Sequence, residues 1–332
     1  MSHTHSWTRG FAMPTEPATL TAAAPGPAPG APDALIAPVS PGLIVWRKMV
    51  RNPRTLAALS LVLLMIFMAL SASFVAPHSY KEQARGSELQ APSTAYVFGT
   101  DDLGRDILSR VIYGAQISML VGLCATGLSL LIGVVIGLVS GYFGGKVDAI
   151  LMRATDTVAA FPSLLLAVAI TAIFERGPAQ PDAWLVTQPA VIILFIALGV
   201  VGWTGMARLV RSQVLSIKTL DYVSAARALG ASNTRIMFRH VLPNCVSPII
   251  VIATLAVGGN ILAEAGLSFL GLGIQDPFPS WGGMLASARG YFENSWWVAV
   301  FPGLAIVATV LAFNLLGDGL RDALDPKKST LS

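Results

Sequence analysis

The sequence contains one glycine-rich tract that could bind phosphate and few other side chains that could catalyse a reaction. Residues 141–147, GYFGGKV, resemble a phosphate-binding loop, but that loop needs a glycine before the tract and a serine or threonine after its lysine. Ser140 and Val147 occupy those two positions. Paired carboxylates, a cysteine–histidine pair and a nucleophile elbow are also missing, and the four histidines are scattered. We therefore expect no catalytic residue and no cofactor or ATP site in this chain.

Acidic residues gather in the tract FGTDDLGRDILSRVIYG, residues 98–114. Asp101, Asp102 and Asp106 suggest calcium, yet an EF-hand loop has its glycine five residues after the first acid and ends on a glutamate. Here the glycine follows Asp102 by two residues, and Tyr113 replaces the glutamate. The tract therefore predicts a turn and then an amphipathic helix leading into an apolar stretch, without a metal ion.

Glu264 lies between two apolar stretches, residues 241–263 and 265–275. A carboxylate at membrane depth is a candidate functional residue. Three roles remain open: a contact or gate on a substrate path together with Ser268, a proton relay, or a structural acid near the outer interface. The relay is the least favoured, because no second acid or histidine lies within the apolar stretches.

A polar, basic segment of residues 219–243 separates two long uncharged stretches. Its first half predicts a short helix with Thr219 as cap, ended by Gly230. The apolar stripe of this helix consists mostly of small residues, namely Tyr222, Ala225, Ala226 and Leu229. Small residues allow close approach to another protein, whereas a stripe facing lipid would carry Leu, Phe or Trp.

The second half of the polar segment predicts another short helix. It can begin at Ser232 or Asn233, and Pro243 is expected to end it. Arg235 and Arg239 lie on the side opposite the apolar residues. The segment is therefore expected to be two helices joined by a glycine elbow, facing water and a protein partner.

Composition places these residues in a membrane protein. The chain is 54% hydrophobic and 12% charged, with a mean hydropathy of +0.66, and this charge is about half that of ordinary soluble domains. Six uncharged stretches approach the length needed to cross ~30 Å of hydrocarbon: residues 56–76, 115–145, 157–174, 183–207, 241–263 and 294–317. The third is barely long enough, and Pro162 interrupts it. The expected fold is an all-α, polytopic membrane bundle of six transmembrane helices.

The distribution of Lys and Arg predicts the orientation. If the N-terminus is cytoplasmic, all but six of the 22 basic residues fall inside, and the six outside are Lys81, Arg85, Arg105, Arg110, Arg176 and Arg289. The positive-inside rule therefore puts both termini and the polar segment in the cytoplasm. The net charge of +4 needs no nucleic acid to explain it, because the cations are spread over short loops.

The spans divide the chain into five parts. The expected parts are a disordered, Pro/Ala-rich cytoplasmic tail (1–42), a segment with the first span (43–77), an extracytoplasmic loop (78–112), a transmembrane domain (113–319) and a cytoplasmic tail (320–332). Cys124 and Cys245 lie within or beside apolar stretches, so no structural disulfide is expected.

Two sets of small residues predict tight helix packing. Ser129, Gly133, Gly137 and Gly141 recur every fourth residue, and Gly199, Gly202 and Gly205 form a similar face. Such spacing lets helix backbones approach closely. Packing within one bundle is favoured over a sliding helix pair.

The polar segment resembles the cytoplasmic coupling loop of the transmembrane subunits of ATP-driven type I importers. That family's signature is Glu-Ala-Ala, three residues, Gly, nine residues, Ile, one residue, Leu-Pro. The matching residues are Ala225, Ala226, Gly230, Leu242 and Pro243, while Ser224 stands in the Glu position and His240 in the Ile position. The resemblance implies that an acidic contact from residue 224 is missing.

Five tracts in order resemble the C-type permease of the dipeptide and oligopeptide importers. They are residues 98–114, GYFGGKVDAILMRATD from Gly141, the polar segment, EAGLSFLGLGIQDPFPSWGGML from Glu264 and FNLLGDGLRDALDP from Phe313. Together the match covers about residues 43–328. Relatives in this family carry dipeptides, oligopeptides, glutathione, nickel chelates or opines.

The resemblance implies a permease subunit of the inner membrane with four partner subunits. These are a homologous B-type permease, two ATPases that bind the ATP and Mg²⁺, and an extracytoplasmic solute-binding protein. ATPase coupling is implied for Tyr222, Ala225, Ala226, Arg227, Gly230, Arg235, Arg239, Leu242 and Pro243. Docking of the binding protein is implied for Asp101, Arg105, Asp106 and Trp281.

Two other function classes remain as alternatives. A secondary transporter would show inverted repeats or further buried acids for ion coupling, and neither is visible. A membrane scaffold would explain the polar segment but would hardly need six spans with tight glycine faces.

Overall fold

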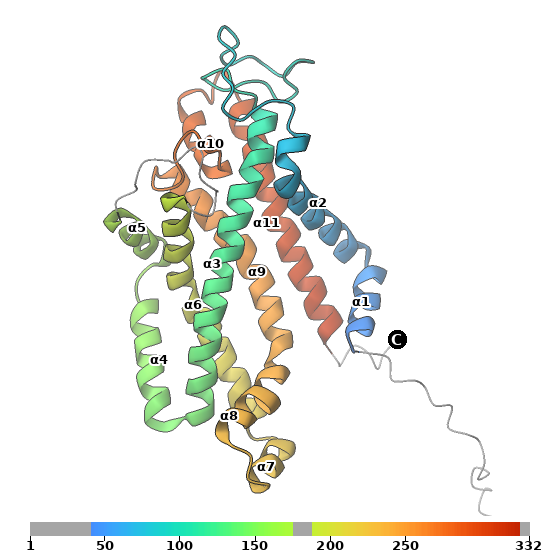
Figure 1. Cartoon of the computed structure of the whole chain (residues 1–332), viewed down its shortest axis with the longest axis vertical. Helices are drawn as coiled ribbons and strands as arrows, with labels where there is room; N and C mark the ends of the chain where they lie inside the picture. Colours follow the sequence, from blue (N-terminus) through green and yellow to red (C-terminus); the bar gives the residue numbers. More distant parts are fainter. Residues whose placement is uncertain (1–40, 175–187, 326–332) are drawn as a thin grey trace, which may run out of the picture. The chain divides into compact units, whose positions relative to one another are not determined.

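A computed structural model describes residues 41–174 and 188–325. Within these ranges five helices are long and apolar enough to cross a membrane. They are α2 (Pro53–Val75), α3 (Ile107–Phe143), α6 (Pro189–Ile217), the continuous run Asn233–Phe269 and α11 (Trp297–Leu324). Figure 1 shows them as a bundle, with the loops between α2 and α3 at one end and the polar segment at the other. The expectation of an all-α membrane bundle is confirmed.

The third expected span, residues 157–174, is wrong as a single helix. The chain instead forms α4 (Gly145–Ala159) and α5 (Ser163–Ile173), bent by 83° where they meet. Pro162 caps α5, and its ring and missing N–H prevent a regular helix from running through the bend. Because α5 alone reaches only about 17 Å, the pair counts as one broken span, which gives up to six spans.

Other helices extend beyond their apolar stretches. The amphipathic helix expected after Asp106 is fused with the second span, and α3 runs for 37 residues with Asp106 as its N-cap. Likewise α6 continues through Arg208 and Arg211 to Ile217. Polar helix turns are stable in water beyond the bilayer, so hydropathy alone underestimates helix length. Some expectations lie outside the described residues. They are the start of the fourth span at residue 183, the N-terminal tail apart from residues 41–42, and the C-terminal tail apart from residues 320–325, with its Lys327 and Lys328.

The remaining elements are short, apart from α9, which is the main part of the run Asn233–Phe269. They are α1 (Pro41–Arg51), α7 (Asp221–Ala228), α8 (Asn233–Ile236), the π-helical turn η2 (Met237–Val241), α9 (Leu242–Phe269), α10 (Trp281–Ser287) and the 3₁₀ turn η3 (Ala288–Gly290). The run Asn233–Phe269 thus consists of α8, η2 and α9.

The most extensive helix packing joins α3 to α6, as the two sets of small residues predict. A Cβ added to Gly133 would lie 2.6 Å from the Cβ of Met206, and one on Gly137 would lie 2.5 Å from the carbonyl oxygen of Ala207. Ser129 donates a hydrogen bond of 3.0 Å to the carbonyl of Gly199 across the same contact. Gly205 is different, because nothing lies within 4 Å of the position its Cβ would take.

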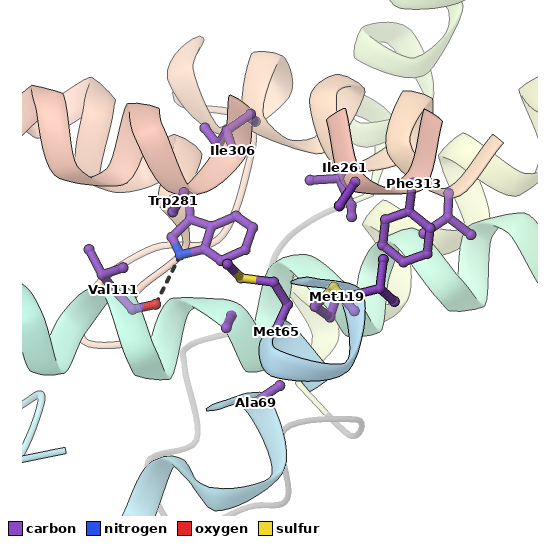
Figure 2. Packing of buried hydrophobic residues seen from close by; sticks show 14 of the residues in the cluster. Met65, Ala69, Val111, Met119, Ile261, Trp281, Ile306 and Phe313 are labelled. Carbon is purple, nitrogen blue, oxygen red and sulfur yellow. Dashed lines mark hydrogen bonds between the residues drawn. The ribbon is translucent and has the colours of Figure 1, made fainter. Parts of the chain in front are cut away.

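Buried apolar side chains gather where α2, α9, α10 and α11 meet α3. Figure 2 shows Met65, Val111, Ile261, Trp281 and Phe313 in this cluster. On the outside of the bundle the large side chains are exposed instead, for example Leu70, Phe74 and Leu131. Such an outward apolar surface suits acyl chains, since lipid rather than water surrounds a membrane bundle.

We expect Gly137→Val to destabilise the bundle, because its side chain would push the α3 and α6 backbones apart. Overpacking in a tight interior typically costs about 1–3 kcal/mol. Thermal unfolding of the purified protein in detergent measures this loss as a lower midpoint. Gly127→Val on the same helix is the matched control, since nothing lies within 4 Å of its Cβ position. Equal midpoints for the two variants would contradict the tight α3–α6 contact.

Candidate functional site

The polar segment, residues 219–243, forms two short helices joined at a glycine, as predicted. Helix α7 ends at Ala228, and Gly230 follows with φ of +80°, a left-handed conformation that glycine adopts without strain. Ser232 then caps α8 by accepting a hydrogen bond of 3.3 Å from the N–H of Arg235. Thr219 is not the first helix's cap. Leu220 holds that position, and the Thr219 hydroxyl donates to the carbonyl of Ser216.

The prediction that Pro243 ends the second helix is wrong. In a regular α-helix the proline ring would clash with the carbonyl of Arg239. The chain avoids this clash by widening into the π turn η2, in which the N–H of Leu242 donates to the carbonyl of Met237. Pro243 then lies in the first turn of α9, where no N–H is needed. The polar segment therefore continues directly into a membrane-spanning helix.

The inner face of the polar segment is part of the protein core. Val223, Ile236 and Val241 are fully buried in a cluster that includes Tyr142 from the end of α3 and Val214 from α6. Contact of this kind makes the two short helices move with the ends of α3 and α6.

Two hydrogen bonds reinforce this attachment. The Tyr142 hydroxyl donates to Oδ1 of Asn233 at 2.8 Å, and Nζ of Lys218 donates to the carbonyl of Gly141 at 2.7 Å. Both bonds begin or end in the last turn of α3. The polar segment is thus fastened to the long helix as well as continuous with α9.

The outer face of the polar segment is open. Leu229 is 88% exposed and Tyr222 is 42% exposed, and Ala225 lies exposed beside them. Of the other predicted coupling residues, Arg227, Gly230, Arg235, Arg239 and Pro243 are exposed, whereas Ala226 and Leu242 are half-buried. None of the three arginines forms an ion pair within the described ranges. A small apolar surface flanked by unpaired positive charge is suited to a protein partner with acidic groups.

An ion pair that the sequence did not reveal braces the same end of the bundle. Arg211 of α6 donates to both carboxylate oxygens of Asp148 in α4, each at 2.6 Å. Ser140 of α3 also donates to Asp148. A bidentate pair of this geometry fixes the relative orientation of the helices that carry it. Three helices are therefore joined where the polar segment begins.

A cleft of about 960 Å³ opens between α6, α9 and α11 at the end of the bundle that carries the polar segment. Its lining mixes apolar, amide, hydroxyl and charged side chains: Leu209, Gln213, Asn244, Ser247, Pro248, Val251, Ile252, Leu255, Arg321, Leu324 and Asp325. Such a lining can accept a small polar solute without strong selectivity. None of these residues was singled out from the sequence.

Glu264 is fully buried near the C-terminal end of α9. Ser118 of α3 donates to its Oε2 at 3.2 Å, and Ser268 donates to its Oε1 at 2.7 Å. Ser280, just before α10, lies 3.4 Å from the Ser268 hydroxyl. The carboxylate therefore connects α3, α9 and the α10 segment through hydroxyl groups. It does not line the large cleft, although Ser268 borders a smaller pocket of about 100 Å³.

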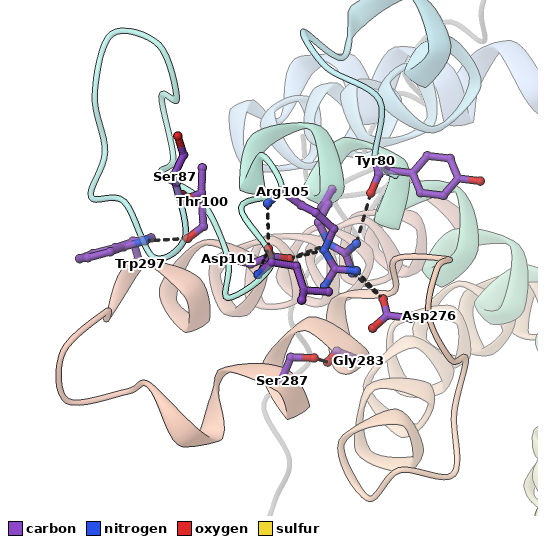
Figure 3. Close-up of polar contacts among 11 residues, drawn as sticks. Tyr80, Ser87, Thr100, Asp101, Arg105, Asp276, Gly283, Ser287 and Trp297 are labelled. Atoms are coloured by element: carbon purple, nitrogen blue, oxygen red, sulfur yellow. Dashed lines mark hydrogen bonds and ion pairs between the residues drawn. The ribbon is translucent and has the colours of Figure 1, made fainter. Parts of the chain in front are cut away.

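A second polar cluster holds together the loops at the end of the bundle opposite the polar segment, which we call the outer loops because the distribution of Lys and Arg favours that side. Asp101 forms a turn by accepting from the N–H groups of Leu103 and Arg105, both at 2.9 Å. The Arg105 guanidinium then bridges Asp101 at 2.6 Å and Asp276 at 2.8 Å, as Figure 3 shows. Arg110 also reaches Asp276, at 3.2 Å. We call these four residues, Asp101, Arg105, Arg110 and Asp276, the outer clamp.

The predicted docking residues for an outer partner are mostly internal. Asp101, Arg105 and Asp106 are at most 5% exposed, and Trp281 is fully buried. Asp106 caps α3 through the N–H of Ser109, and the Trp281 indole donates to the carbonyl of Val111 at 2.9 Å. The interpretation of these four side chains as surface contacts is therefore wrong. They fold the outer loops instead.

Burial raises the pKa of Asp276, but Arg105 and Arg110 outweigh it and hold that pKa below its usual value. A lowered pKa in the folded state means that this group's contribution to stability is present above the ordinary carboxyl range and is lost only as pH falls through the lowered value. The Asp276 carboxylate of the outer clamp therefore stays ionised at physiological pH.

Sequence reasoning missed the partners that complete these sites. Asp276 lies 171 residues from Arg105, and Ser118 lies 146 residues from Glu264. No local spacing links such pairs. Within the described ranges no three His, Cys, Asp or Glu residues gather as metal ligands. The candidate site is therefore a mechanical one: an exposed two-helix surface joined rigidly to a bundle with a cleft.

Two family models together match most of the chain. The model described as "Binding-protein-dependent transport system inner membrane component" matches residues 133–330. The model described as "N-terminal TM domain of oligopeptide transport permease C" matches residues 40–92. The first match includes the polar segment, the cleft and Glu264.

Similar proteins cover almost the same length. A di/tripeptide transport system permease protein of Pseudomonas aeruginosa is 45% identical, over 90% of this chain and 96% of its own. A glutathione transport system permease protein of Pectobacterium atrosepticum is 43% identical, over 85% of this chain and 90% of its own. A dipeptide transport system permease protein of Bacillus subtilis is 42% identical, over 85% and 84%.

We expect Asp276→Asn to loosen the outer loops, because Arg105 and Arg110 would lose a shared carboxylate. Hydrogen–deuterium exchange of peptides covering residues 79–106 and 270–283 should become roughly ten-fold faster, since a hydrogen bond to a charged group contributes about 1.5–3 kcal/mol and half-exposed Asp276 is partly screened. Asp102→Asn is the control, because Asp102 forms no ion pair in the described chain. Unchanged exchange in both variants would rule out the clamp.

Proposed function

Because the chain belongs to the family of binding-protein-dependent transport system inner membrane components, as a C-type permease of dipeptide and oligopeptide ABC importers, we propose that it forms half of a peptide pathway across the inner membrane. ATP hydrolysis drives transport and takes place in two partner ATPases, which bind the ATP and Mg²⁺. The observation that carries the proposal is the exposed polar segment, whose inner face belongs to the core and whose second helix continues into α9.

The polar segment is the ATPase-coupling element. Its exposed Tyr222, Ala225 and Leu229 fit an apolar cleft on the ATPase, and Arg227, Arg235 and Arg239 meet acidic groups around that cleft. Movement of the docked ATPases is passed to α3, α6 and α9 through the buried face of the segment. This assignment requires the segment and both chain termini to be cytoplasmic, which the distribution of Lys and Arg favours.

Ser224 and His240, which depart from the family signature, fit this coupling role in different ways. Ser224 is exposed and uncharged, so docking relies on small-residue fit and arginine contacts rather than on an acid. His240 is half-buried, and its backbone carbonyl accepts a hydrogen bond of 2.7 Å from the side chain of Asn244. The histidine position thus supports the start of α9.

Two further partners complete the importer. A homologous B-type permease supplies the second half of the pathway and faces the open cleft between α6, α9 and α11. An extracytoplasmic solute-binding protein docks on the outer loops. The exposed parts of residues 78–106, which the outer clamp holds in place, provide the surface for it.

Dipeptides and short oligopeptides are the proposed solutes. Support comes from the names of the relatives, two of which are dipeptide or di/tripeptide permeases. The mixed amide, hydroxyl and apolar lining of the cleft suits a solute whose backbone is constant and whose side chains vary. Glutathione is the second candidate, since a glutathione permease is 43% identical; nickel chelates are a more distant alternative.

Glu264 and Ser268 are proposed to act as a gate rather than as a substrate contact. Their hydroxyl–carboxylate cluster joins α9 to α3 and to the α10 segment. Tilting of α9 would have to break or rearrange these bonds.

We expect Ala226→Glu to leave the complex assembled in the membrane but to reduce ATP-driven uptake at least ten-fold, because a charged, longer side chain would prevent close docking. Gly230→Leu should act similarly, since leucine is strained at a φ of +80°. Uptake and ATP hydrolysis are measured together in proteoliposomes containing all partner subunits.

The control for this experiment is Ala226→Ser, which keeps the side chain small and should retain uptake. Normal uptake in both Ala226→Glu and Gly230→Leu would contradict the coupling assignment. Loss of the protein from the membrane would instead indicate a folding defect. Gly230→Ala would then separate folding from docking, because alanine keeps the backbone strain at residue 230 but lacks the large side chain of leucine.

We expect a deletion strain to lose uptake of labelled dipeptides and to regain it when this chain is restored. Labelled glutathione and pentapeptides are compared in the same strain. Uptake of glutathione but not of dipeptides would select the second candidate, and failure with every peptide would favour nickel chelates or opines.

A further inference from the structure

Helix α1, Pro41–Arg51, precedes the first span and is too short to cross a membrane. Its 11 residues extend over only about 17 Å. At Asn52 the chain turns, and the Asn52 side chain caps α2 by accepting a hydrogen bond of 3.1 Å from the N–H of Arg54. Helix α1 therefore lies at the end of a spanning helix, where the bilayer meets water.

One side of α1 packs on the protein. Met49 is 8% exposed and belongs to the core cluster around α2 and α11, and Val45, one turn earlier, packs against the same cluster. Figure 1 shows α1 beside the lower part of α11, well away from α7 and α8. The helix is thus fixed in position without contributing to the ATPase-coupling surface.

The next side of α1 is apolar but exposed. Leu43, Trp46 and Val50 follow one another at spacings of three and four residues, so they share a face. They are 42%, 53% and 38% exposed. Tryptophan is enriched where a bilayer meets water, because its ring is apolar and its N–H is polar.

The remaining side of α1 is basic. Arg47, Lys48 and Arg51 share it, and Arg54 follows in the first turn of α2. Residues 41–75 contain no acid. None of the four cations forms an ion pair with any residue of the described ranges. Ile44 is the one apolar residue on this face, where it lies between Arg51 and Lys48, and it is also exposed.

We propose that α1 is a binding site for the headgroups of anionic phospholipids. An apolar face beside a basic face, next to a spanning helix, matches the two parts of such a lipid: acyl chains contact Leu43, Trp46 and Val50, and the phosphate contacts Arg47, Lys48 and Arg51. A lipid rather than a protein is favoured as the partner, because Trp46 lies directly before the apolar span α2, at the level where tryptophan contacts lipid headgroups. The inference is independent of the transported solute and of the ATPases.

Fluorescence of Trp46 tests the proposal in the full-length chain. The chain is reconstituted in vesicles of phosphatidylcholine that contain either brominated phosphatidylglycerol or brominated phosphatidylcholine at the same fraction. The signal of Trp46 is the difference between the native chain and Trp46→Phe, which removes the contribution of the other tryptophans. Bromine quenches only rings that contact the lipid, so the two vesicles give the preference for the anionic headgroup at this position.

We expect brominated phosphatidylglycerol to be preferred at Trp46 by roughly ten-fold or more, since each cation near an anionic surface strengthens binding several-fold. The triple variant Arg47→Gln, Lys48→Gln, Arg51→Gln should bring the preference close to unity, and 0.5 M salt should weaken it in the native chain. The matched control removes the same number of charges from the polar segment, as Arg227→Gln, Arg235→Gln, Arg239→Gln, and should keep the preference.

Three results would overturn the proposal. Trp46 could escape quenching by both brominated lipids, which would mean that protein or water covers this face. Equal quenching by the two lipids would mean that no anionic site exists. An equal loss of preference in the triple variant and in its control would mean that net charge, not α1, attracts the lipid. Because no transport is measured, none of these results depends on whether the chain is a peptide permease.

Discussion

The close approach of α3 and α6 is the constraint on which the rest of the structure depends. Their backbones touch at Gly133 and Gly137, where no side chain fits. Backbone contact in a membrane bundle gains from dispersion over a long interface, because lipid supplies no hydrophobic drive to press helices together. A rigid pair results, and the other helices are arranged around it.

Helix α3 carries an attachment at each level of the bundle. Arg110 of the outer clamp lies in the first turns of α3. Ser118, about a third of the way along the helix, donates a hydrogen bond to Glu264, and Tyr142 in the last turn donates one to Asn233. These three contacts lie along one helix of 37 residues, or about 55 Å. A displacement at one end of α3 therefore affects groups at the other end without any flexible link between them.

The run Asn233–Phe269 forms a second continuous connection, from the polar segment to Glu264. The run has an irregular turn at its start, the π turn Met237–Val241, which admits Pro243. Such turns often occur at functional positions in helices. The turn lies beside the exposed surface of the polar segment. A change in docking there would therefore act first on this turn and then on α9.

Local patterns in the sequence predicted most of the spans, the glycine face of α3 and the two helices around Gly230, and the distribution of basic residues favours one orientation in the membrane. Each depends on spacing along one segment or on composition, which a chain carries before it folds. The continuation through Pro243 and the burial of Asp101, Arg105, Asp106 and Trp281 were decided only by the tertiary structure. Whether a charged or aromatic side chain lies on the surface depends on which distant segment returns to cover it. Arg105 is internal because Asp276, 171 residues away, comes back to within 2.8 Å of it.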